Sequence, residues 1–276
     1  MTRPFLKMNG LGNDFVVVDA RQAPFAPDAV SARAIADRTG GVGCDQLISV
    51  EPSDRADAFM RIWNADGGEV EACGNASRCV AWLLMQESGR ETVRLDTPAG
   101  VLEATRAGPQ SITVDMGEPR LRWDEIPLAE EMDTRGIELQ VGPIDAPLLH
   151  TPGAVSIGNP HVVFFVADVE QAPVRGSGSL IENHPLFPEG VNVGFAEVVD
   201  RGRIRLRVWE RGAGETKACG TGACAAVVAA HRRGLVERRC EVELPGGTLT
   251  IDWREGDGHV LMTGPVALDF EGELPG

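Results

Sequence analysis

The fold is decided by a stretch that occurs twice, "MRIWNADGGEVEACG" (Met60–Gly74) and "LRVWERGAGETKACG" (Leu206–Gly220). Aligned without a gap, the two share Arg, Trp, Gly, Glu, Ala, Cys and Gly, and the offset is 146 residues (Gly74 against Gly220). The same offset places Gly12-Asn13 of "GLGNDFVVVD" over Gly158-Asn159 of "SIGNPHVVFFV". Matches in the same order over such a length indicate a duplicated unit.

The duplication sets the expected domain organisation. We predict two homologous halves, residues 1–118 and 119–264, and a final strand within 265–276 that returns to the sheet of the first half. A chain of 276 residues is also long enough for two domains.

Each half alternates strand patterns with few helices. Helices are expected at 74–88 and 220–234, and the second is apolar on nearly every side, which is typical of a helix buried all round. We therefore predict an α+β fold of two pseudo-symmetric domains, each a curved, barrel-like mixed sheet wrapped around a central helix. The remaining expected elements are a helix at 29–39 and strands at 5–9, 14–19, 58–64, 92–97, 101–106, 111–116, 161–166, 204–210, 240–245, 249–253, 259–264 and 266–274.

Composition excludes several classes of partner. The formal net charge of −15 argues against nucleic acid and anionic membranes, and the longest apolar runs are too short to span a bilayer. We see no signal-peptide pattern at the start and expect a cytoplasmic protein. The six cysteines include no CxxC pair, so we expect free thiols and no metal site.

Cys73 and Cys219 each precede a glycine and a predicted helix. Helix N-termini favour anions because their first N–H groups lack partners and the dipole is positive there. Two consequences are expected: the pKa of each thiol is lowered toward neutrality, and the neighbouring amides can hold a carboxylate. Those amides belong to Gly74, Asn75, Gly220 and Thr221.

If the two halves bring both helix starts to one cleft, one sulfur lies on each face of a substrate α-carbon. One thiolate would then remove the α-proton and the opposite thiol would deliver another, which is racemisation or epimerisation. The alternative is that both cysteines are small core residues. Only two lysines exist, Lys7 and Lys217, neither in a context for pyridoxal phosphate, and "GLGND" lacks a dinucleotide fingerprint, so we expect no cofactor.

The two halves differ at positions where a substrate with an amino-acid group at each end would need different contacts. Glu210 offers a carboxylate to an ammonium group, and Arg211 offers a fork to a second carboxylate, although the two could equally be a solvated pair. His161 could tune a thiol or be an ordinary buried histidine. The asparagines in turn-like contexts, which could orient the substrate or only shape turns, are Asn13, Asn64, Asn159 and Asn192.

Six segments carry a family resemblance: "KMNGLGNDFVVVD", "GVGCDQL", "NADGGEVEACGNASRC", "IGNPHVV", "GVNVGF" and "WERGAGETKACGTGACAA". They resemble diaminopimelate epimerases, which interconvert LL- and meso-diaminopimelate without a cofactor in bacterial lysine and peptidoglycan precursor synthesis. The resemblance implies the two-domain fold, an acid–base pair of Cys73 and Cys219, and a homodimer. It implies that His161 and Glu210 adjust the cysteines.

The same resemblance assigns the substrate contacts. It makes Gly74, Asn75, Gly220 and Thr221 the carboxylate cradle, and it makes the further contacts Asn13, Gln46, Asn64, Asn159, Asn192, Glu210 and Arg211. Phe270 stands where the family commonly has a tyrosine that supports the dimer contact.

Two alternatives remain. A proline or hydroxyproline racemase has a similar architecture but holds only one amino-acid group, which Glu210 and Arg211 argue against. A non-catalytic redox or binding protein on the same fold is disfavoured because both cysteines are intact.

Overall fold

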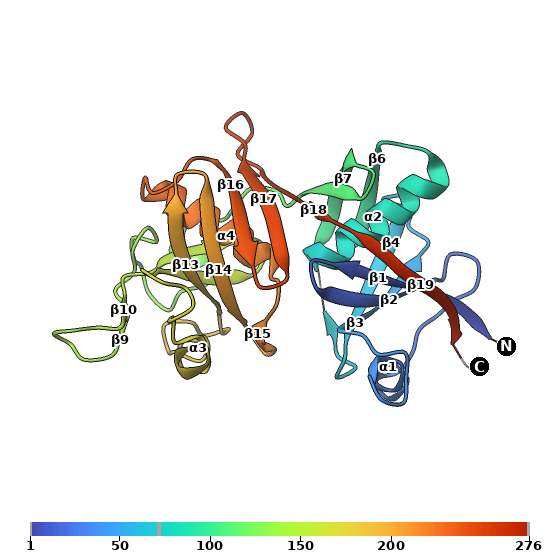
Figure 1. Ribbon diagram of the computed structural model, residues 1–276, viewed down its shortest axis with the longest axis horizontal. Coiled ribbons are helices and arrows are strands. Elements are labelled where there is room, and N and C mark those ends of the chain that lie inside the picture. The colour runs from blue at the N-terminus through green and yellow to red at the C-terminus, as the bar shows by residue number, and fades with distance from the viewer. Residues whose placement is uncertain (1, 71–72, 275–276) are drawn as a thin grey trace. The chain divides into compact units, whose positions relative to one another are not determined.

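The computed structural model describes residues 2–70 and 73–274, in two compact units (Figure 1). Residues 1–115 with 263–276 form the first unit, and residues 116–262 form the second. Glu71 and Ala72 of the first cysteine motif, and Pro275 and Gly276 of the tail, lie outside the described residues. Each unit is described by itself.

The first unit is a mixed sheet around a helix. Its strands pair in the order β19–β1–β2–β3–β4–β6–β7–β8; β2–β3 and β4–β6 are parallel and the others antiparallel. Helix α2 (Gly74–Ser88) contacts β1, β2, β6, β7 and β8, while α1 (Ala29–Ala36) contacts β3 and β4. The strands are β1 (Arg3–Gly10), β2 (Asn13–Asp19), β3 (Gln46–Glu51), β4 (Ala58–Asn64), β5 (Glu69–Val70, paired with β4), β6 (Thr92–Thr97), β7 (Gly100–Gly108), β8 (Ser111–Asp115) and β19 (Ala267–Leu274).

The second unit repeats this plan. Its strands pair in the order β11–β12–β13–β14–β16–β17, with β12–β13 and β14–β16 parallel. Helix α4 (Gly220–Arg232) contacts all six of these strands, and α3 (Val174–Glu182) contacts β13, β14 and β15. The strands are β11 (Gly153–Ser156), β12 (Pro160–Phe165), β13 (Asn192–Asp200), β14 (Arg203–Glu210), β15 (Gly214–Thr216), β16 (Arg239–Leu244) and β17 (Gly247–Trp253).

Three short elements precede this sheet in the chain, and one strand follows it. The first three are a 3-10 turn, η1 (Trp123–Glu125), and the strand pair β9 (Gln140–Val141) and β10 (Leu149–His150). Strand β18 (Val260–Pro265) then carries the chain from the second unit back into the first, where β19 pairs with β1.

Strand register repeats at the sequence offset. Phe15 faces Gln46 across β2–β3, and His161 faces Asn192 across β12–β13, so equivalent residues occupy equivalent pairs. Leu47–Trp63 and Val193–Trp209 repeat in the same way. The predicted α+β class with a mixed sheet around a helix in each half is confirmed.

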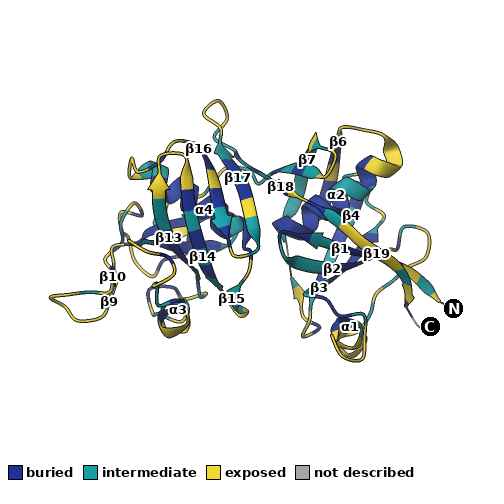
Figure 2. Cartoon of the chain, in the orientation of Figure 1, coloured by how far each residue is buried: buried dark blue, intermediate teal, exposed yellow. Residues whose placement is uncertain are grey.

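Both central helices are enclosed. Every residue of α4 from 222 to 230 is buried, and most are alanine or valine, small enough for the sheet to close around them (Figure 2). Helix α2 is buried along 74–81 and includes Arg78, whose exposed fraction is 0%. Arg78 Nε donates to the Pro265 carbonyl at 3.5 Å, which provides a polar partner inside the unit.

Helices α1 and α3 and strands β3 and β13 differ from the expectations. Helix α1 ends at Ala36 rather than 39 because Asp37 is extended and accepts the Thr39 and Gly40 N–H groups. Helix α3 was not predicted because two glycines interrupt its pattern; a Cβ on Gly178 would lie 2.4 Å from the Trp209 ring. Strands β3 and β13 were missed because central strands carry continuous buried runs without alternation.

Enclosure of α4 makes a stability prediction. Ala226→Leu should lower the free energy of unfolding by about 1–3 kcal/mol, because the added atoms have no space inside the closed sheet. Ala34→Leu, on the exposed face of α1, is the matched control and should change it by less than about 0.5 kcal/mol. Urea unfolding of both variants measures the difference; equal stabilities would show that α4 is not tightly enclosed.

Candidate active site at the two helix starts

Both cysteines are themselves the N-cap residues of the central helices. Cys73 is extended immediately before α2, and Cys219 is extended immediately before α4. The Cys219 sulfur accepts the Gly222 N–H at 3.3 Å, as a serine oxygen would. Asn75 and Thr221 are the second residues of α2 and α4.

The side chain at the second position of each helix forms a hydrogen bond with an asparagine at an equivalent position of its unit. Asn75 Nδ2 donates to Asn13 Oδ1 at 2.6 Å, and Asn159 Nδ2 donates to Thr221 Oγ1 at 3.3 Å. In both pairs the residues are 62 positions apart, so the contact is duplicated along with the fold. Each helix start thus has a cysteine beside a polar pair in which the asparagine is the first residue of β2 or lies just before β12.

In the first unit this polar pair rests on an ionic cluster. Asn13 Nδ2 donates to Asp45 Oδ2 at 3.4 Å, and Arg38 bridges Asp45 to Asp14, with both distances 2.7 Å. Lys7 Nζ lies 2.6 Å from Asp14 Oδ2 and also donates to the Gly43 carbonyl. Burial opposes ionisation of Asp14, but the hydrogen bonds from Arg38 and Lys7 outweigh it and hold its pKa well below the usual range. Lys7 therefore has a structural role in this cluster.

Gln46 and Asn64 complete the first unit's candidate residues. They face each other at the ends of β3 and β4, and Gln46 Nε2 donates to Asn64 Oδ1 at 2.9 Å. Asp66 shapes the turn that follows, since its Oδ1 accepts the Gly68 N–H at 2.9 Å.

In the second unit a buried imidazole lies beneath the helix start. His161 Nε2 lies 3.0 Å from both Asn159 Oδ1 and Thr221 Oγ1. Burial, with a smaller contribution from the positive charge of Arg211, lowers the pKa of His161 to about 3. The ring is therefore neutral at physiological pH, and its contacts tie together the two polar residues next to Cys219.

Cys219 contradicts the expected lowering of its thiol pKa. Burial raises the pKa of Cys219 well above its ordinary value, and the negative charge of Glu210 raises it further. Hydrogen bonds from Thr221 and from the Gly222 N–H act in the opposite direction but do not offset these two effects. At neutral pH Cys219 is therefore a thiol beside a carboxyl group, not a thiolate.

Strands β14 and β15 form a hairpin, and a side chain from β15 holds Glu210 close to Cys219. Its Oε1 accepts the Thr216 hydroxyl at 2.5 Å, from β15. Burial raises the pKa of Glu210, while the Thr216 and Cys219 hydrogen bonds lower it again in part.

Arg211 lies at the exposed tip of the same hairpin. Its N–H donates to Asn192 Oδ1 at 3.0 Å, and its Nη1 donates to the Glu189 carbonyl at 2.7 Å. Asn192 is itself oriented by a bond from its Nδ2 to the Pro160 carbonyl at 2.9 Å. Backbone contacts thus position Arg211 while its guanidinium reaches solvent.

Within the second unit, then, one set of contacts brings together His161, Asn159, Thr221, Cys219, Glu210, Asn192 and Arg211. Sequence reasoning missed Thr216 and Glu182, which hold residues of this set from other elements, and Asp45, which holds Asn13 in the first unit. Thr216 lies in "WERGAGETKACG" and Asp45 in "GVGCDQL", but neither motif marks these contacts, and Glu182 stands in no quoted motif.

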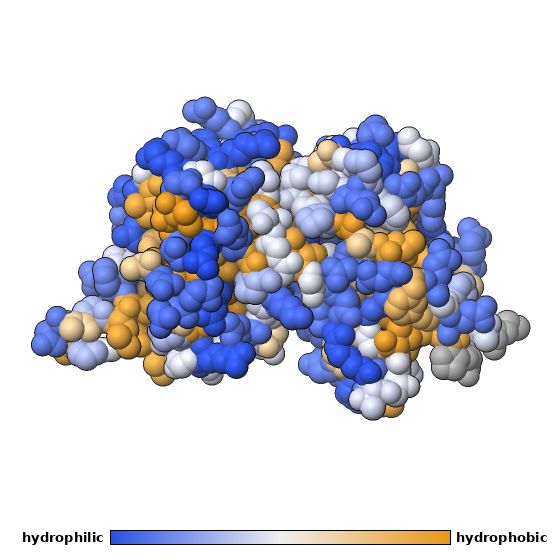
Figure 3. Space-filling model, in the orientation of Figure 1, coloured by the Kyte–Doolittle hydropathy of each residue, from blue (hydrophilic) through white to orange (hydrophobic). Residues whose placement is uncertain are grey.

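Phe270 lies apart from these residues, on β19. Its side chain is 49% exposed, and its ring meets Phe5 edge to face with centroids 6.0 Å apart. Exposed apolar residues occur among hydrophilic ones on this unit in Figure 3.

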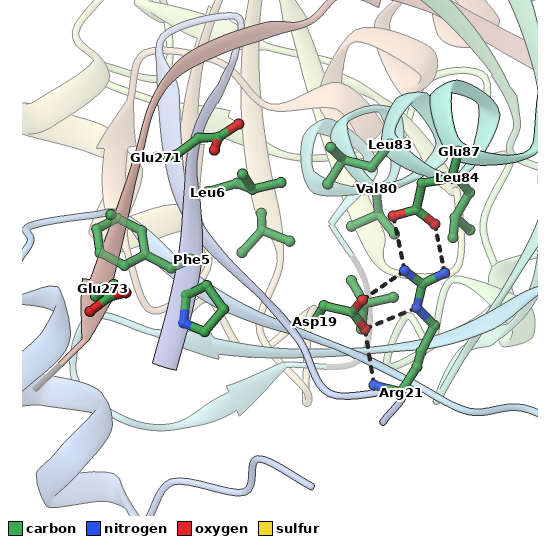
Figure 4. A pocket seen from close by; sticks show the side chains of 14 residues that line it. Phe5, Leu6, Asp19, Arg21, Val80, Leu83, Leu84, Glu87, Glu271 and Glu273 are labelled. Carbon is green, nitrogen blue, oxygen red and sulfur yellow. Dashed lines mark hydrogen bonds and ion pairs between the residues drawn. The ribbon is translucent and has the colours of Figure 1, made fainter. Parts of the chain in front are cut away.

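Beside β1 and β19 lies a hollow of about 510 Å³, lined by β1, β2, β19 and α2 (Figure 4). Leu6, Val80 and Leu84 supply apolar walls, and Arg21 bridges Asp19 and Glu87 at its edge. Neither Cys73 nor the asparagine pair lines this hollow, so it is separate from the candidate site of this unit.

The described residues contain neither a metal-binding cluster nor a membrane-crossing helix. No group of three or more His, Cys, Asp and Glu side chains there is arranged to hold a metal ion. Among the helices in the described ranges, none combines the length and apolarity needed to cross a membrane.

Comparison with known proteins agrees with this picture. The family model described as diaminopimelate epimerase matches residues 5–122 and 153–268. A diaminopimelate epimerase of Phenylobacterium zucineum is 65% identical, covering 100% of this chain and 99% of that protein. One of Caulobacter sp. is 63% identical, covering 100% of this chain and 98% of the relative.

Solved structures share the fold at low identity. A predicted epimerase from Pseudomonas aeruginosa has a TM-score of 0.69 at 20% identity, with 99% of both chains covered. A hydroxyproline epimerase from Agrobacterium vitis has a TM-score of 0.68 at 18% identity, covering 99% of this chain and 91% of the other. A phenazine biosynthesis protein of the PhzF family from Enterococcus faecalis has a TM-score of 0.66 at 17% identity, and both chains are fully covered.

The contact between Glu210 and Cys219 makes a prediction about the thiol. Glu210→Gln removes the negative charge, so the pKa of Cys219 should fall, although burial will keep it above that of a free thiol. Thiolate absorbance in the ultraviolet, measured against pH and corrected with Cys219→Ala, reports the shift. Glu215→Gln is the control, because Glu215 pairs with Arg175 and Arg207 and should leave the Cys219 titration in place. An identical titration in Glu210→Gln would show that the carboxylate does not govern the thiol.

Proposed function

The chain belongs to the diaminopimelate epimerase family, and on that basis we propose that it interconverts LL- and meso-diaminopimelate by a two-base transfer at the α-carbon, without a cofactor. The observation that carries this proposal is the duplicated helix start, with a cysteine as N-cap and a polar pair beside it in each unit. Relatives of that name at 63% and 65% identity over the whole chain support the choice of substrate.

The proposed chemistry assigns the two sulfurs opposite protonation states. Abstraction of an α-proton needs a base, so one cysteine must enter as thiolate, and inversion needs a proton delivered to the other face. The raised pKa of Cys219 supports its starting as the thiol that donates, with Cys73 as the acceptor. In the reverse direction the roles exchange, and Glu210 then faces the Cys219 thiolate that has lost its proton.

The carbanion formed at the α-carbon has enediolate character, so negative charge grows on the carboxylate. Helix N-termini stabilise such charge, since their first N–H groups point outward and the dipole is positive there. We assign this task to the amides of Gly74 and Asn75 in α2 and of Gly220 and Thr221 in α4. Cys219 occupies the Gly222 N–H, the third of its helix, which leaves the first two positions to the substrate.

The far end of diaminopimelate carries a second ammonium and a second carboxylate. Arg211, exposed at its hairpin tip, supplies a guanidinium for the carboxylate, with one Nη1 donor already held by the Glu189 carbonyl, and Glu210 lies next to it in the chain. The amide side chains assigned to orienting the substrate are Asn13, Gln46, Asn64, Asn159 and Asn192. A proline racemase would have no use for a second charged end.

We propose a cytoplasmic homodimer. The six cysteines form no disulfide in the described part of the chain, which supports a reducing compartment. Phe270 supports a contact between copies, because it is a large exposed apolar side chain on β19 next to the Phe5 ring. Epimerase activity found only in a membrane or extracellular fraction would contradict the location.

The proposed function is tested by tracing the origin of the hydrogen at the inverted α-carbon. LL-diaminopimelate incubated in heavy water without added cofactor and stopped early should give meso product that carries solvent deuterium at the inverted carbon. The unreacted substrate should stay largely protiated, because reversal returns the abstracted proton from the same sulfur to the same face before that sulfur exchanges with solvent. Nuclear magnetic resonance or mass spectrometry of both species measures the label.

Variants sharpen this test. Cys73→Ala and Cys219→Ala should each abolish epimerisation in both directions, whereas Cys240→Ala, a buried cysteine at the start of β16, should remain active. Product that keeps the original hydrogen, or a single-cysteine variant with near-normal turnover, would contradict the two-base proposal. Turnover of proline but not diaminopimelate would assign the chain to the racemase alternative.

The dimer proposal has its own test. Phe270→Asp puts a charge on the exposed face of β19, and we expect the sedimentation coefficient to fall from that of a dimer to that of a monomer at the same protein concentration. Leu235→Asp, at a partly exposed apolar residue of the second unit, is the control and should leave the mass unchanged. A wild-type chain that sediments as a monomer, or a Phe270→Asp dimer, would overturn the assignment.

A further inference from the structure

The hairpin tip between β14 and β15 is held from outside by one carboxylate. Glu182, the last residue of α3, accepts the Trp209 indole N–H on Oε2 at 2.7 Å and the Gly212 backbone N–H on Oε1 at 2.9 Å. The two donors flank Glu210 and Arg211 in the chain. Each oxygen of Glu182 therefore fixes one side of the pair assigned to the far end of the substrate.

We call these two hydrogen bonds of Glu182 the clamp. Neighbouring contacts fit α3 closely to the hairpin tip that the clamp holds. Gly178, one turn before Glu182, has no side chain, and a Cβ there would lie 2.4 Å from the Trp209 ring, so α3 packs directly on the indole. Gly212 has a φ of +75°, a conformation that favours glycine, and its N–H is directed to Glu182. Helix α3 and the tip are thus fitted to each other at both residues.

The first unit holds its corresponding tip differently. There the Arg33 guanidinium of α1 donates to the Asp66 carbonyl at 3.0 Å, and the Ala29 backbone packs on Gly67. That tip carries Asn64-Ala65-Asp66 in place of Glu210-Arg211-Gly212. The two-oxygen clamp therefore occurs in the unit whose tip carries the arginine.

We propose that Glu182 is a positioning residue for substrate recognition, which fixes Arg211 to receive the distal carboxylate; this rests on the proposed function. Glu210 is held separately by Thr216 at 2.5 Å and therefore depends less on Glu182. Loss of the clamp then loosens Arg211 more than the groups around Cys219. Substrate affinity should suffer while the chemical step is largely kept.

The test variant is Glu182→Gln, which keeps the shape but can accept only one of the two N–H groups and presents its own NH₂ to the other. We expect KM for LL-diaminopimelate to rise on the order of 10-fold, with kcat within about 3-fold of wild type. Glu197→Gln is the matched control, because Glu197 also accepts a backbone N–H, from Val169, and an arginine, Arg205, in the same unit away from the tip. It should leave both constants near wild type.

A double-mutant cycle separates positioning of Arg211 from general damage. If Glu182 acts through Arg211, Glu182→Gln should add little to the KM of Arg211→Ala, whereas independent effects would multiply. Additive effects, or a fall in kcat as large as the rise in KM, would overturn the proposal.

A second readout does not depend on turnover. Hydrogen exchange of segment 209–216 should be faster in Glu182→Gln than in wild type or Glu197→Gln, since one of the two N–H groups that hold the tip to Glu182 loses its acceptor. Unchanged exchange would overturn the clamp itself. A wild-type chain without turnover of diaminopimelate would refute the proposed function and with it the role in recognition, and faster exchange in that case would show a clamp with no part in this reaction.

Discussion

An apolar helix enclosed by a curved sheet can present polar groups only at its ends, and this constraint governs the rest of the molecule. In α4 the run from 222 to 230 is buried, so nothing along its sides can contact a charged ligand. The first N–H groups of the helix, however, have no partner within it and carry the positive end of the dipole. The chain places a cysteine at that point twice. The sheet therefore determines where an anion and a thiol can meet.

Duplication explains the scaffold, and divergence explains its chemistry. Polar contacts that hold the helix starts are kept in register, as in Asn13–Asn75 and Asn159–Thr221. Other equivalent positions have changed character: Phe15 of the first unit corresponds to His161 of the second. Phe15 is a fully buried hydrophobic residue, whereas His161 is a neutral imidazole bonded to both members of the polar pair. One backbone thus carries two different electrostatic environments.

Local pattern was enough to predict the central helices and the two-fold plan, because caps and burial leave clear traces in sequence. Helix α2 was placed at its observed bounds, since Gly89 ends it in a left-handed conformation. Helix α3 escaped because Gly176 and Gly178 weaken its pattern, and the reason for Gly178 lies in Trp209, far along the chain. The family resemblance likewise supplied Gln46, whose bond to Asn64 follows from strand pairing.

The direction of the pKa shift of Cys219 could not be predicted from the sequence for a related reason. A helix start lowers the pKa of a thiol only when water and positive charge dominate its surroundings. The sequence showed the helix start but not the depth of burial, nor that the carboxyl of Glu210 returns to the sulfur from the end of β14. Both effects stabilise the protonated form and outweigh the bond from Gly222.

In a reaction where one sulfur accepts a proton and the other gives one, two identical thiols would have to divide one protonated and one ionised state between them by chance. The carboxylate beside Cys219 favours the state in which that sulfur holds the proton. Glu210 corresponds to Asn64 of the first unit, so this carboxylate is a difference between the units carried on a shared backbone plan.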